Sequence, residues 1–122
     1  MATILIVEDH AVTQRTITYT LKKGNYQTVV AANGKEALAR LAEQAVDLIL
    51  CDIAMPEMDG LDFLRNMRAD KRFARLPVIM LTASGQDEDR ITARTLGAND
   101  FLSKPTSTRE LLETVARWLT RA

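Results

Sequence analysis

The sequence predicts an α/β fold: a doubly wound parallel sheet of five strands with five helices on its two faces. Short apolar runs rich in Val, Ile and Leu alternate with longer segments of helical spacing, and this alternation occurs five times. Repeated strand–helix units favour a parallel sheet that helices cover on both sides. The length of 122 residues fits one domain and leaves little room for a second, so residues 1–122 are predicted to form a single domain.

The first three strand–helix units are marked by apolar runs and by residues that begin or end helices. Ile17 and Leu21 lie four residues apart on one face of the first helix. Asn33 can cap the second helix, and a turn at Asp59-Gly60 precedes the third. The strands are expected at Thr3–Val7, Gln27–Ala31 and Leu48–Cys51, and the helices at Val12–Lys23, Gly34–Gln44 and Leu61–Arg68.

The last two units follow the same pattern. Pro77 stands just before the fourth apolar run, as is common at the start of a strand. Ser107 and Glu110 have the spacing of a capping box, which predicts the start of the last helix. The fifth run is less apolar than the others, which favours a place at the edge of the sheet. The strands are expected at Val78–Leu81 and Asp100–Ser103, and the helices from Asp87 to the residue before Gly97 and from Ser107 to the chain end.

The composition argues against several classes of function. The 16 basic and 16 acidic residues cancel, so the net charge gives no reason to expect direct binding to nucleic acid or to a membrane surface. Cys51 is the only cysteine, which excludes an intrachain disulfide and a cysteine zinc cluster. No apolar stretch approaches the roughly 18 residues of a membrane span, and no signal-peptide leader precedes the first strand. The chain is therefore expected to be cytoplasmic.

Four of the five predicted strands end in residues that phosphoryl chemistry uses. Glu8-Asp9 follow the first strand, Asp52 the third, Thr82 the fourth and Lys104 the fifth. The carboxyl ends of parallel strands lie along one edge of the sheet, where ligands and catalytic groups of such folds gather. We therefore expect three carboxylates, one hydroxyl and one ammonium group to lie close together at this edge.

The three carboxylates at this edge predict a cation site. Two unit charges about 4 Å apart repel by roughly 4 kcal/mol at an effective dielectric constant near 20. Glu8, Asp9 and Asp52 must therefore share a proton, raise their pKa values or bind a cation, and their oxygens suit Mg²⁺. The alternative is that Glu8 and Asp9 only cap the following helix. One histidine makes no metal cluster, so His10 is interpreted as an exposed loop residue, with a hydrogen bond to the acidic pocket as the alternative.

Asp52 is also a candidate nucleophile. A carboxylate can attack phosphorus and form an aspartyl phosphate, provided that the charge of the phosphoryl oxygens is neutralised. Mg²⁺ and the Lys104 ammonium could provide that neutralisation, and Thr82 could donate a hydrogen bond to the same group. The alternatives are that Lys104 is an exposed loop lysine and that the Thr82 hydroxyl is satisfied by the backbone.

These residues stand in strings that resemble the receiver domains of two-component response regulators, and in particular the chemotaxis response regulator family. The resemblance covers essentially the whole chain, and the motifs occur in the same order as in the family. The string that begins at Asp52 is highly specific. The strings are Val7-Glu8-Asp9, Asp52-Ile-Ala-Met-Pro-Glu-Met-Asp-Gly60, Leu81-Thr82-Ala83 and Gly97-Ala-Asn-Asp-Phe-Leu-Ser-Lys104-Pro105.

The resemblance implies a flavodoxin-like sheet of strand order 2-1-3-4-5 and a role for each site residue. Asp52 would be the phosphoacceptor. Mg²⁺, with Mn²⁺ as an alternative, would be held by Glu8, Asp9, Asp52 and the backbone carbonyl of Ala54. Lys104 would pair with the phosphoryl group, and the Lys104-Pro105 peptide bond would be cis.

The resemblance also implies a switch and two kinds of partner. Thr82 would move toward the phosphoryl oxygens, and Phe101 would change rotamer with it. The surface formed by the fourth helix, fifth strand and fifth helix would therefore differ between the phosphorylated and unphosphorylated states. The phosphoryl donor would be a sensor histidine kinase or a histidine phosphotransfer protein, and the output partner is unknown. Ala54 and Ser84 occupy positions that can steer the hydrolytic water, which leaves the lifetime of the phosphate open.

Three other functions fit the pattern less well. An aspartyl-phosphate phosphatase or phosphotransferase on a similar sheet needs a second acid two residues after its nucleophile, where this chain has Ala54, and carries the nucleophile after the first strand. A flavin or nucleotide binder binds phosphate through backbone amides of Gly, Ser or Thr after the first strand. This chain has Glu8-Asp9 there, and these carboxylates would repel phosphate. A receiver-like module that is never phosphorylated should lack a key residue, and none is missing.

Overall fold

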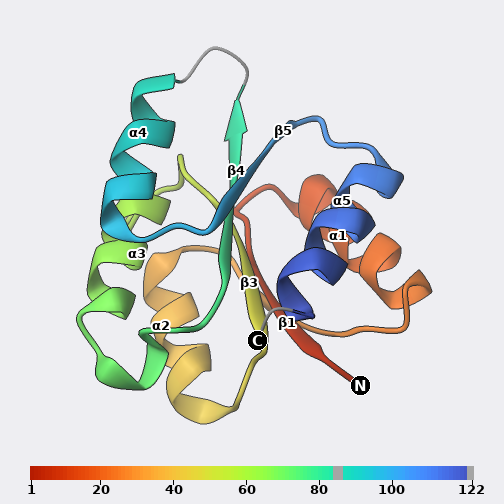
Figure 1. Cartoon of the computed structure of the whole chain (residues 1–122), viewed down its shortest axis with the longest axis horizontal. Coiled ribbons are helices and arrows are strands. Elements are labelled where there is room, and N and C mark those ends of the chain that lie inside the picture. The colour runs from red at the N-terminus through yellow and green to blue at the C-terminus, as the bar shows by residue number, and fades with distance from the viewer. Residues whose placement is uncertain (84–86, 121–122) are drawn as a thin grey trace.

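The computed structural model describes residues 1–83 and 87–120, and within them it contains five strands and five α-helices (Figure 1). No helix of this described part combines the length and the apolar character needed to cross a bilayer. The strands are β1 (Thr3–Val7), β2 (Gln27–Ala31), β3 (Leu48–Asp52), β4 (Val78–Ala83) and β5 (Asp100–Lys104). The helices are α1 (Ala11–Lys23), α2 (Gly34–Glu43), α3 (Gly60–Arg68), α4 (Asp87–Leu96) and α5 (Thr108–Leu119), with a 3-10 turn, η1, at Lys71–Phe73.

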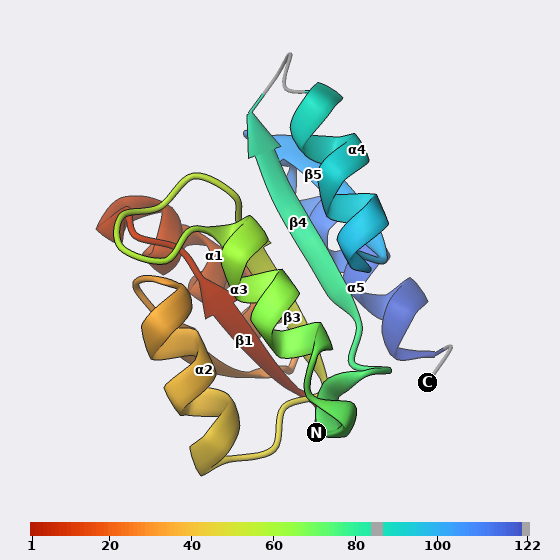
Figure 2. The same ribbon diagram turned by 90° about the vertical axis from the view of Figure 1, so that its left-hand side faces the viewer.

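The strands form one parallel sheet in the order β2-β1-β3-β4-β5, which confirms the predicted doubly wound topology. The strand order reverses between β1 and β3, the two central strands that carry the predicted acids at their ends. β5 lies at an edge, as its weaker apolar character indicated. Figures 1 and 2 show helices on both sides of the sheet.

Two hydrophobic cores occupy the two faces of the sheet. One core lies between the sheet and α1 and α5, and the other lies between the sheet and α2, α3 and α4. Strands β1 and β3 contribute to both cores because successive side chains of a strand point to opposite faces. The first core includes Ile17, Leu21, Leu111 and Val115, and the second includes Ala37, Leu41, Phe63, Leu64, Met67 and Ala93.

This alternation places the charged residues of the predicted site on one face. Ile6 in β1 and Leu50 in β3 belong to the core against α1 and α5. Glu8 and Asp52, two residues further along, continue that face, and so does Lys104 at the end of β5. The three charged side chains therefore approach one another across the carboxyl edge of the sheet.

The two residues of the predicted switch continue the opposite face. Met80 in β4 lies in the core against α2, α3 and α4, and Phe101 in β5 packs against the same core. Thr82, two residues after Met80, follows that face by the same alternation. Thr82 and Phe101 therefore stand on the side of the sheet that α4 covers.

The observed bounds correct several predicted strand ends. β3 includes Asp52, β4 extends through Thr82 to Ala83, and β5 includes Lys104. Each of these residues pairs with a neighbouring strand, Asp52 with Leu81 and Ala83 with Lys104. A strand ends where its pairing with the neighbouring strand ends, and the length of the apolar run in the sequence does not indicate that position.

The helix bounds differ from the predictions by one or a few residues. α1 and α3 begin one residue earlier than predicted, α2 ends at Glu43 and α5 ends at Leu119, before the chain end. The η1 turn was not predicted, since three residues are too short for periodicity to show. Asn33 and Ser107 cap their helices as expected, accepting hydrogen bonds from the amides of Glu36 and Glu110.

Gly60 fixes the position of the loop that follows Asp52. Its amide donates to the carbonyl oxygen of Ile53 at 2.8 Å. A Cβ at this position would press against the Asp52 carbonyl oxygen and lie 2.8 Å from Ile53 Cα. Both obstacles are backbone atoms, so they cannot rotate away as a side chain could.

We expect Gly60→Ala to lower the free energy of unfolding by about 3 kcal/mol, because overpacking against backbone forces the chain to shift. Urea denaturation measures this loss. Gly24→Ala is the matched control, since the one atom that its Cβ would approach closer than 3.0 Å is the end of the Leu112 side chain, at 2.9 Å, while the Leu21 carbonyl oxygen lies at 3.4 Å. Equal losses in the two variants would contradict the backbone-contact argument.

Candidate functional site

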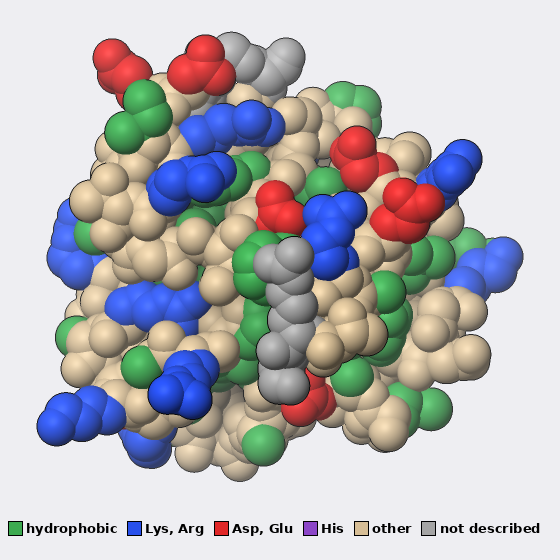
Figure 3. Space-filling model, viewed as in Figure 1, with side chains coloured by type: hydrophobic (Ala, Val, Ile, Leu, Met, Phe, Trp, Pro, Cys, Tyr) green, Lys and Arg blue, Asp and Glu red, His purple; other side chains and the backbone are tan. Residues whose placement is uncertain are grey.

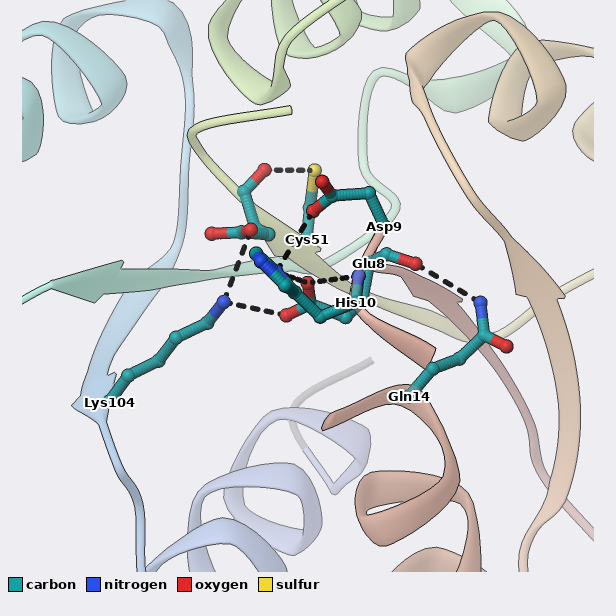
Figure 4. Close-up of polar contacts among 7 residues, drawn as sticks. Glu8, Asp9, His10, Gln14, Cys51 and Lys104 are labelled. Carbon is teal, nitrogen blue, oxygen red and sulfur yellow. Dashed lines mark hydrogen bonds and ion pairs between the residues drawn. The ribbon is translucent and has the colours of Figure 1, made fainter. Parts of the chain in front are cut away.

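Side chains from the ends of three strands meet at the carboxyl edge of the sheet (Figure 4). Each of Glu8, Asp9, His10 and Asp52 offers one ligand atom, and these atoms all lie within 4.8 Å of one another. Lys104 Nζ lies 2.6 Å from Glu8 Oε1 and 3.1 Å from Asp52 Oδ2. The structure thus brings together the acids of the first and third strands and the lysine of the fifth, and Lys104 is not the free loop lysine of the alternative interpretation.

Glu8 is held by the start of α1 and by Lys104. Its side chain is fully buried, and Glu8 Oε2 accepts a hydrogen bond from the His10 amide at 3.1 Å. Gln14 Nε2 in α1 donates to the Glu8 carbonyl oxygen at 3.0 Å. The N-cap of α1 is His10, without a side-chain capping bond. The interpretation that Glu8 and Asp9 only cap this helix is therefore wrong.

Burial and the shared lysine set the pKa values of this cluster. Burial raises the pKa of Glu8, but hydrogen bonds from Lys104 and from the His10 amide outweigh it, and the net pKa is lowered. For Asp52, burial and the charge of Glu8 raise the pKa more than Lys104 lowers it. Burial alone would lower the pKa of Lys104, yet its bonds to Glu8 and Asp52 raise it. Lys104 is therefore charged in this site, whereas the surroundings of Asp52 disfavour its ionised form.

This raised pKa predicts that Asp52→Asn stabilises the protein at pH 7 without divalent cations. In wild type, folding disfavours the Asp52 carboxylate. This loss of stability is full above the folded pKa and vanishes below the unfolded value near 3.8. Each pKa unit corresponds to about 1.4 kcal/mol, and each kcal/mol to about 4 °C in Tm for a domain of this size. Thermal unfolding in EDTA should show a Tm gain at pH 7 that shrinks toward pH 4.

Asp62→Asn is the control for that measurement, because Asp62 is an exposed acid on α3 outside the cluster. Its replacement should change the Tm little at any pH. An Asp52→Asn protein that is less stable than wild type at pH 7 would contradict the assigned direction of the pKa shift.

The donor set fits a divalent cation. Asp9 Oδ1 is buried and accepts no hydrogen bond within the described residues, although it lies 3.3 Å from His10 Nδ1 and can pair with that ring when it is protonated. Carboxylate oxygens are the ligands that Mg²⁺ prefers, and a cation would supply the partner that Asp9 Oδ1 lacks. Ala54, the fourth predicted ligand, lies exposed in the loop two residues after Asp52.

Thr82 and Phe101 lie beside this cluster rather than in it. The Thr82 side chain is buried, and its hydroxyl makes no hydrogen bond within the described part of the chain. The interpretation that the backbone satisfies this hydroxyl is therefore wrong. The Lys104–Pro105 peptide bond is cis. Ser84 lies outside the described residues.

Two arginines of α4, Arg90 and Arg94, stand over the Phe101 ring, a contact that the sequence analysis did not predict. The guanidinium carbons of Arg90 and Arg94 lie 5.7 and 5.2 Å from the ring centroid, within the range of cation–π attraction. Arg90 also donates to the Ser103 hydroxyl at 2.9 Å. Figure 3 shows basic side chains over α4 on this face of the molecule. Nothing in the sequence marks these contacts, because they depend on how α4 lies against β5.

Comparisons with known proteins agree with this geometry. A family model described as the response regulator receiver domain matches residues 4–116. The chain is 40% identical over 119 residues to the transcriptional regulatory protein ResD of Bacillus subtilis, covering 98% of this chain and 48% of ResD. It is 36% identical over 110 residues to the phosphate regulon transcriptional regulatory protein PhoB of Pseudomonas aeruginosa, covering 90% of this chain and 48% of PhoB.

A solved structure shares the whole fold. The receiver domain of the sensor histidine kinase PA1611 of Pseudomonas aeruginosa PAO1, which has a magnesium ion coordinated in its active site cleft, matches with a TM-score of 0.91 and 35% identity over 98% of both chains. The chain spans about half the length of the curated relatives it matches. These relatives are response regulators and not phosphatases, so the phosphatase alternative gains no support.

Proposed function

Because this chain belongs to the response regulator receiver domain family, we propose that Asp52 is the residue on which it accepts a phosphoryl group. Receiver domains are the phosphoacceptors of two-component signal transduction and are not classical enzymes. The observation that carries the assignment is the Asp52 carboxylate, which is buried and lies 3.1 Å from Lys104 Nζ. Lys104 lies between Asp52 and Glu8, so an ammonium is already in place beside the acceptor oxygen.

We propose that the chain catalyses only its own phosphorylation and dephosphorylation. An Asp52 carboxylate oxygen forms a bond to phosphorus while the phosphorus–nitrogen bond of a phosphohistidine donor breaks, and the imidazole leaves with the electron pair. The Lys104 ammonium pairs with the phosphoryl oxygens and offsets their charge. Water later cleaves the acyl phosphate, which returns the Asp52 carboxylate and inorganic phosphate.

The metal that we assign to the site is Mg²⁺, with Mn²⁺ as an alternative. Glu8, Asp9, Asp52 and the backbone carbonyl of Ala54 would hold it. The orphaned Asp9 Oδ1 and the all-oxygen set of these donors support the assignment. The related PA1611 receiver domain has a magnesium ion coordinated in its active site cleft. When bound, such an ion neutralises charge on the phosphoryl oxygens.

We further propose that Thr82 and Phe101 transmit the effect of phosphorylation from Asp52 to the surface of α4, β5 and α5. A phosphoryl group adds negative charge and strong acceptor oxygens to the pocket, and the Thr82 hydroxyl has no competing partner among the described residues. Movement of Thr82 would leave space on the α4 side of the sheet, where Phe101 stands. The surface of α4, β5 and α5 would then differ between the two states.

Thr82→Val tests this role of the hydroxyl. Replacing an unsatisfied buried hydroxyl by a methyl group of similar shape should stabilise the unphosphorylated protein by about 1 kcal/mol in urea denaturation. The same change should abolish the response of the Phe101 amide signal to a bound phosphate mimic. Thr82→Ser, which keeps the hydroxyl, is the control and should retain that response. If the Phe101 amide signal of Thr82→Val responds fully to the phosphate mimic, the Thr82 hydroxyl has no role in the switch.

The partners and the extent of the domain are part of the proposal. The phosphoryl donor would be a sensor histidine kinase or a histidine phosphotransfer protein, and the output protein or domain is unknown. We propose that residues 1–122 form one cytoplasmic receiver domain that binds neither nucleic acid nor membrane directly. The balance of charges in the sequence supports that view.

Beryllium fluoride, a non-covalent mimic of the phosphoryl group, tests the assembled site by two-dimensional NMR. With Mg²⁺ and beryllium fluoride together, saturable shifts are expected for the amides of Asp52, Thr82, Phe101 and Lys104. Without Mg²⁺ the shifts should be absent. Spectra that stay unchanged at saturating concentrations of both reagents would overturn the proposed site.

A further inference from the structure

We infer that His10 is a metal ligand that gives this site a preference for Zn²⁺ over Mg²⁺. The inference rests on the proposed function, because it concerns the same acidic pocket. It departs from the interpretation of His10 as a simple loop residue. The ring is exposed, with 72% of the side chain accessible, yet its Nδ1 atom is directed at the pocket (Figure 4).

The geometry around Nδ1 suits a shared ion. His10 Nδ1 lies 3.3 Å from Glu8 Oε2 and 3.3 Å from Asp9 Oδ1. Two ligands at 2.0–2.1 Å from a tetrahedral ion lie about 3.3 Å apart. The widest separation among the four donor atoms, 4.8 Å, is about 1.5 Å more than two ligands of one tetrahedral ion allow, so at least one side chain must move inward when the ion binds.

The chemistry of the donors separates the two ions. Mg²⁺ takes oxygen ligands and keeps several waters, so an imidazole adds little to its binding. Imidazole suits Zn²⁺, whereas carboxylate, carbonyl and water ligands suit Mg²⁺. Asp9 Oδ1, which is buried and accepts no hydrogen bond from the part of the chain that the structure describes, provides an oxygen beside that nitrogen. Zn²⁺ bound there would compete with Mg²⁺ for Asp9 and Asp52.

NMR of the untagged full chain tests the inference directly. His10 is the only histidine, so ¹⁵N labelling gives the signals of a single imidazole ring. Titration with Zn²⁺ is expected to shift the Nδ1 resonance strongly, whereas saturating Mg²⁺ should leave it nearly unchanged. An imidazole that only hydrogen-bonds Glu8 would show no such difference between the ions.

Affinities measured by competition with a chromophoric chelator provide the second readout. His10→Ala should bind Zn²⁺ about tenfold more weakly, or weaker still, with Mg²⁺ affinity unchanged. Asp9→Asn should weaken both ions. Glu43→Gln, an exposed acid at the end of α2, is the matched control and should weaken neither.

The outcomes separate this inference from the proposed function. Zn²⁺ affinity that is equal in wild type and His10→Ala, with normal Mg²⁺ binding, would overturn the role of His10 and leave the Mg²⁺ site standing. Failure of wild type to bind either ion would overturn both. A Zn²⁺-specific shift of Nδ1 together with the loss in His10→Ala would support the inference.

Discussion

Asp52→Ala is expected to take up no phosphoryl group from a small acyl phosphate donor, while the fold persists. Asp52 is the one carboxylate of the cluster that belongs to a central strand, is buried and lies 3.1 Å from Lys104 Nζ. Removing the Asp52 carboxylate removes the oxygen that we propose forms the bond to phosphorus. Intact mass spectrometry with Mg²⁺ should show one added phosphate in wild type and none in the variant.

The fold should survive because the substitution also removes a disfavoured charge. Circular dichroism and a cooperative thermal transition check that point. Asp62→Ala, which removes an exposed acid of α3 that pairs with Arg65, is the matched control and should label like wild type. Phosphate on the Asp52→Ala protein at wild-type level would move the acceptor role to another residue.

Lys104→Met is expected to lower the rate of phosphorylation by about 10²–10³-fold, the scale on which loss of one preorganised donor slows a reaction. Methionine keeps an unbranched stem of similar length but removes the ammonium that lies 2.6 Å from Glu8 Oε1 and 3.1 Å from Asp52 Oδ2. Without it, the two buried carboxylates and the incoming phosphoryl oxygens lose the one ammonium group that contacts Glu8 and Asp52 in the described part of the chain. The labelling rate at saturating donor and Mg²⁺ measures the effect.

The matched control for Lys104→Met is Lys71→Met, which removes an exposed lysine in η1, at the other end of the sheet from the site. Its rate should equal that of wild type. A Lys104→Met protein that labels within a few-fold of wild type would mean that the bound cation alone neutralises the phosphoryl oxygens, and Lys104 would become a structural partner of Glu8.

The sequence predicted the parallel sheet and the edge where the site lies from one regularity, whereas the strand order and the role of each residue came from the family resemblance. Parallel strands end at one edge, so residues that follow apolar runs, such as Glu8, Asp52 and Lys104, must approach one another there. Strand alternation then decides the face that each residue takes. The strand ends were missed because inter-strand pairing extends β3 to Asp52 and β4 to Ala83 beyond the apolar runs.

The remaining features depend on distances that no sequence pattern contains. Three features depend on how separate elements pack: the sharing of Lys104 between two acids, the lack of a hydrogen-bond partner for Thr82 among the described residues, and the position of Arg94 over Phe101. His10 was predicted to be exposed, and it is, but its contact with Glu8 and Asp9 comes from the turn between β1 and α1.

The most direct test of the central claim locates the phosphate in the wild-type chain. The protein is incubated with a small acyl phosphate donor, with and without Mg²⁺, and then treated with borohydride, which reduces an aspartyl phosphate to homoserine. Peptide mass spectrometry should find homoserine at position 52 only when both donor and Mg²⁺ are present. Homoserine at another aspartate, or phosphate uptake that is independent of Mg²⁺, would contradict the account.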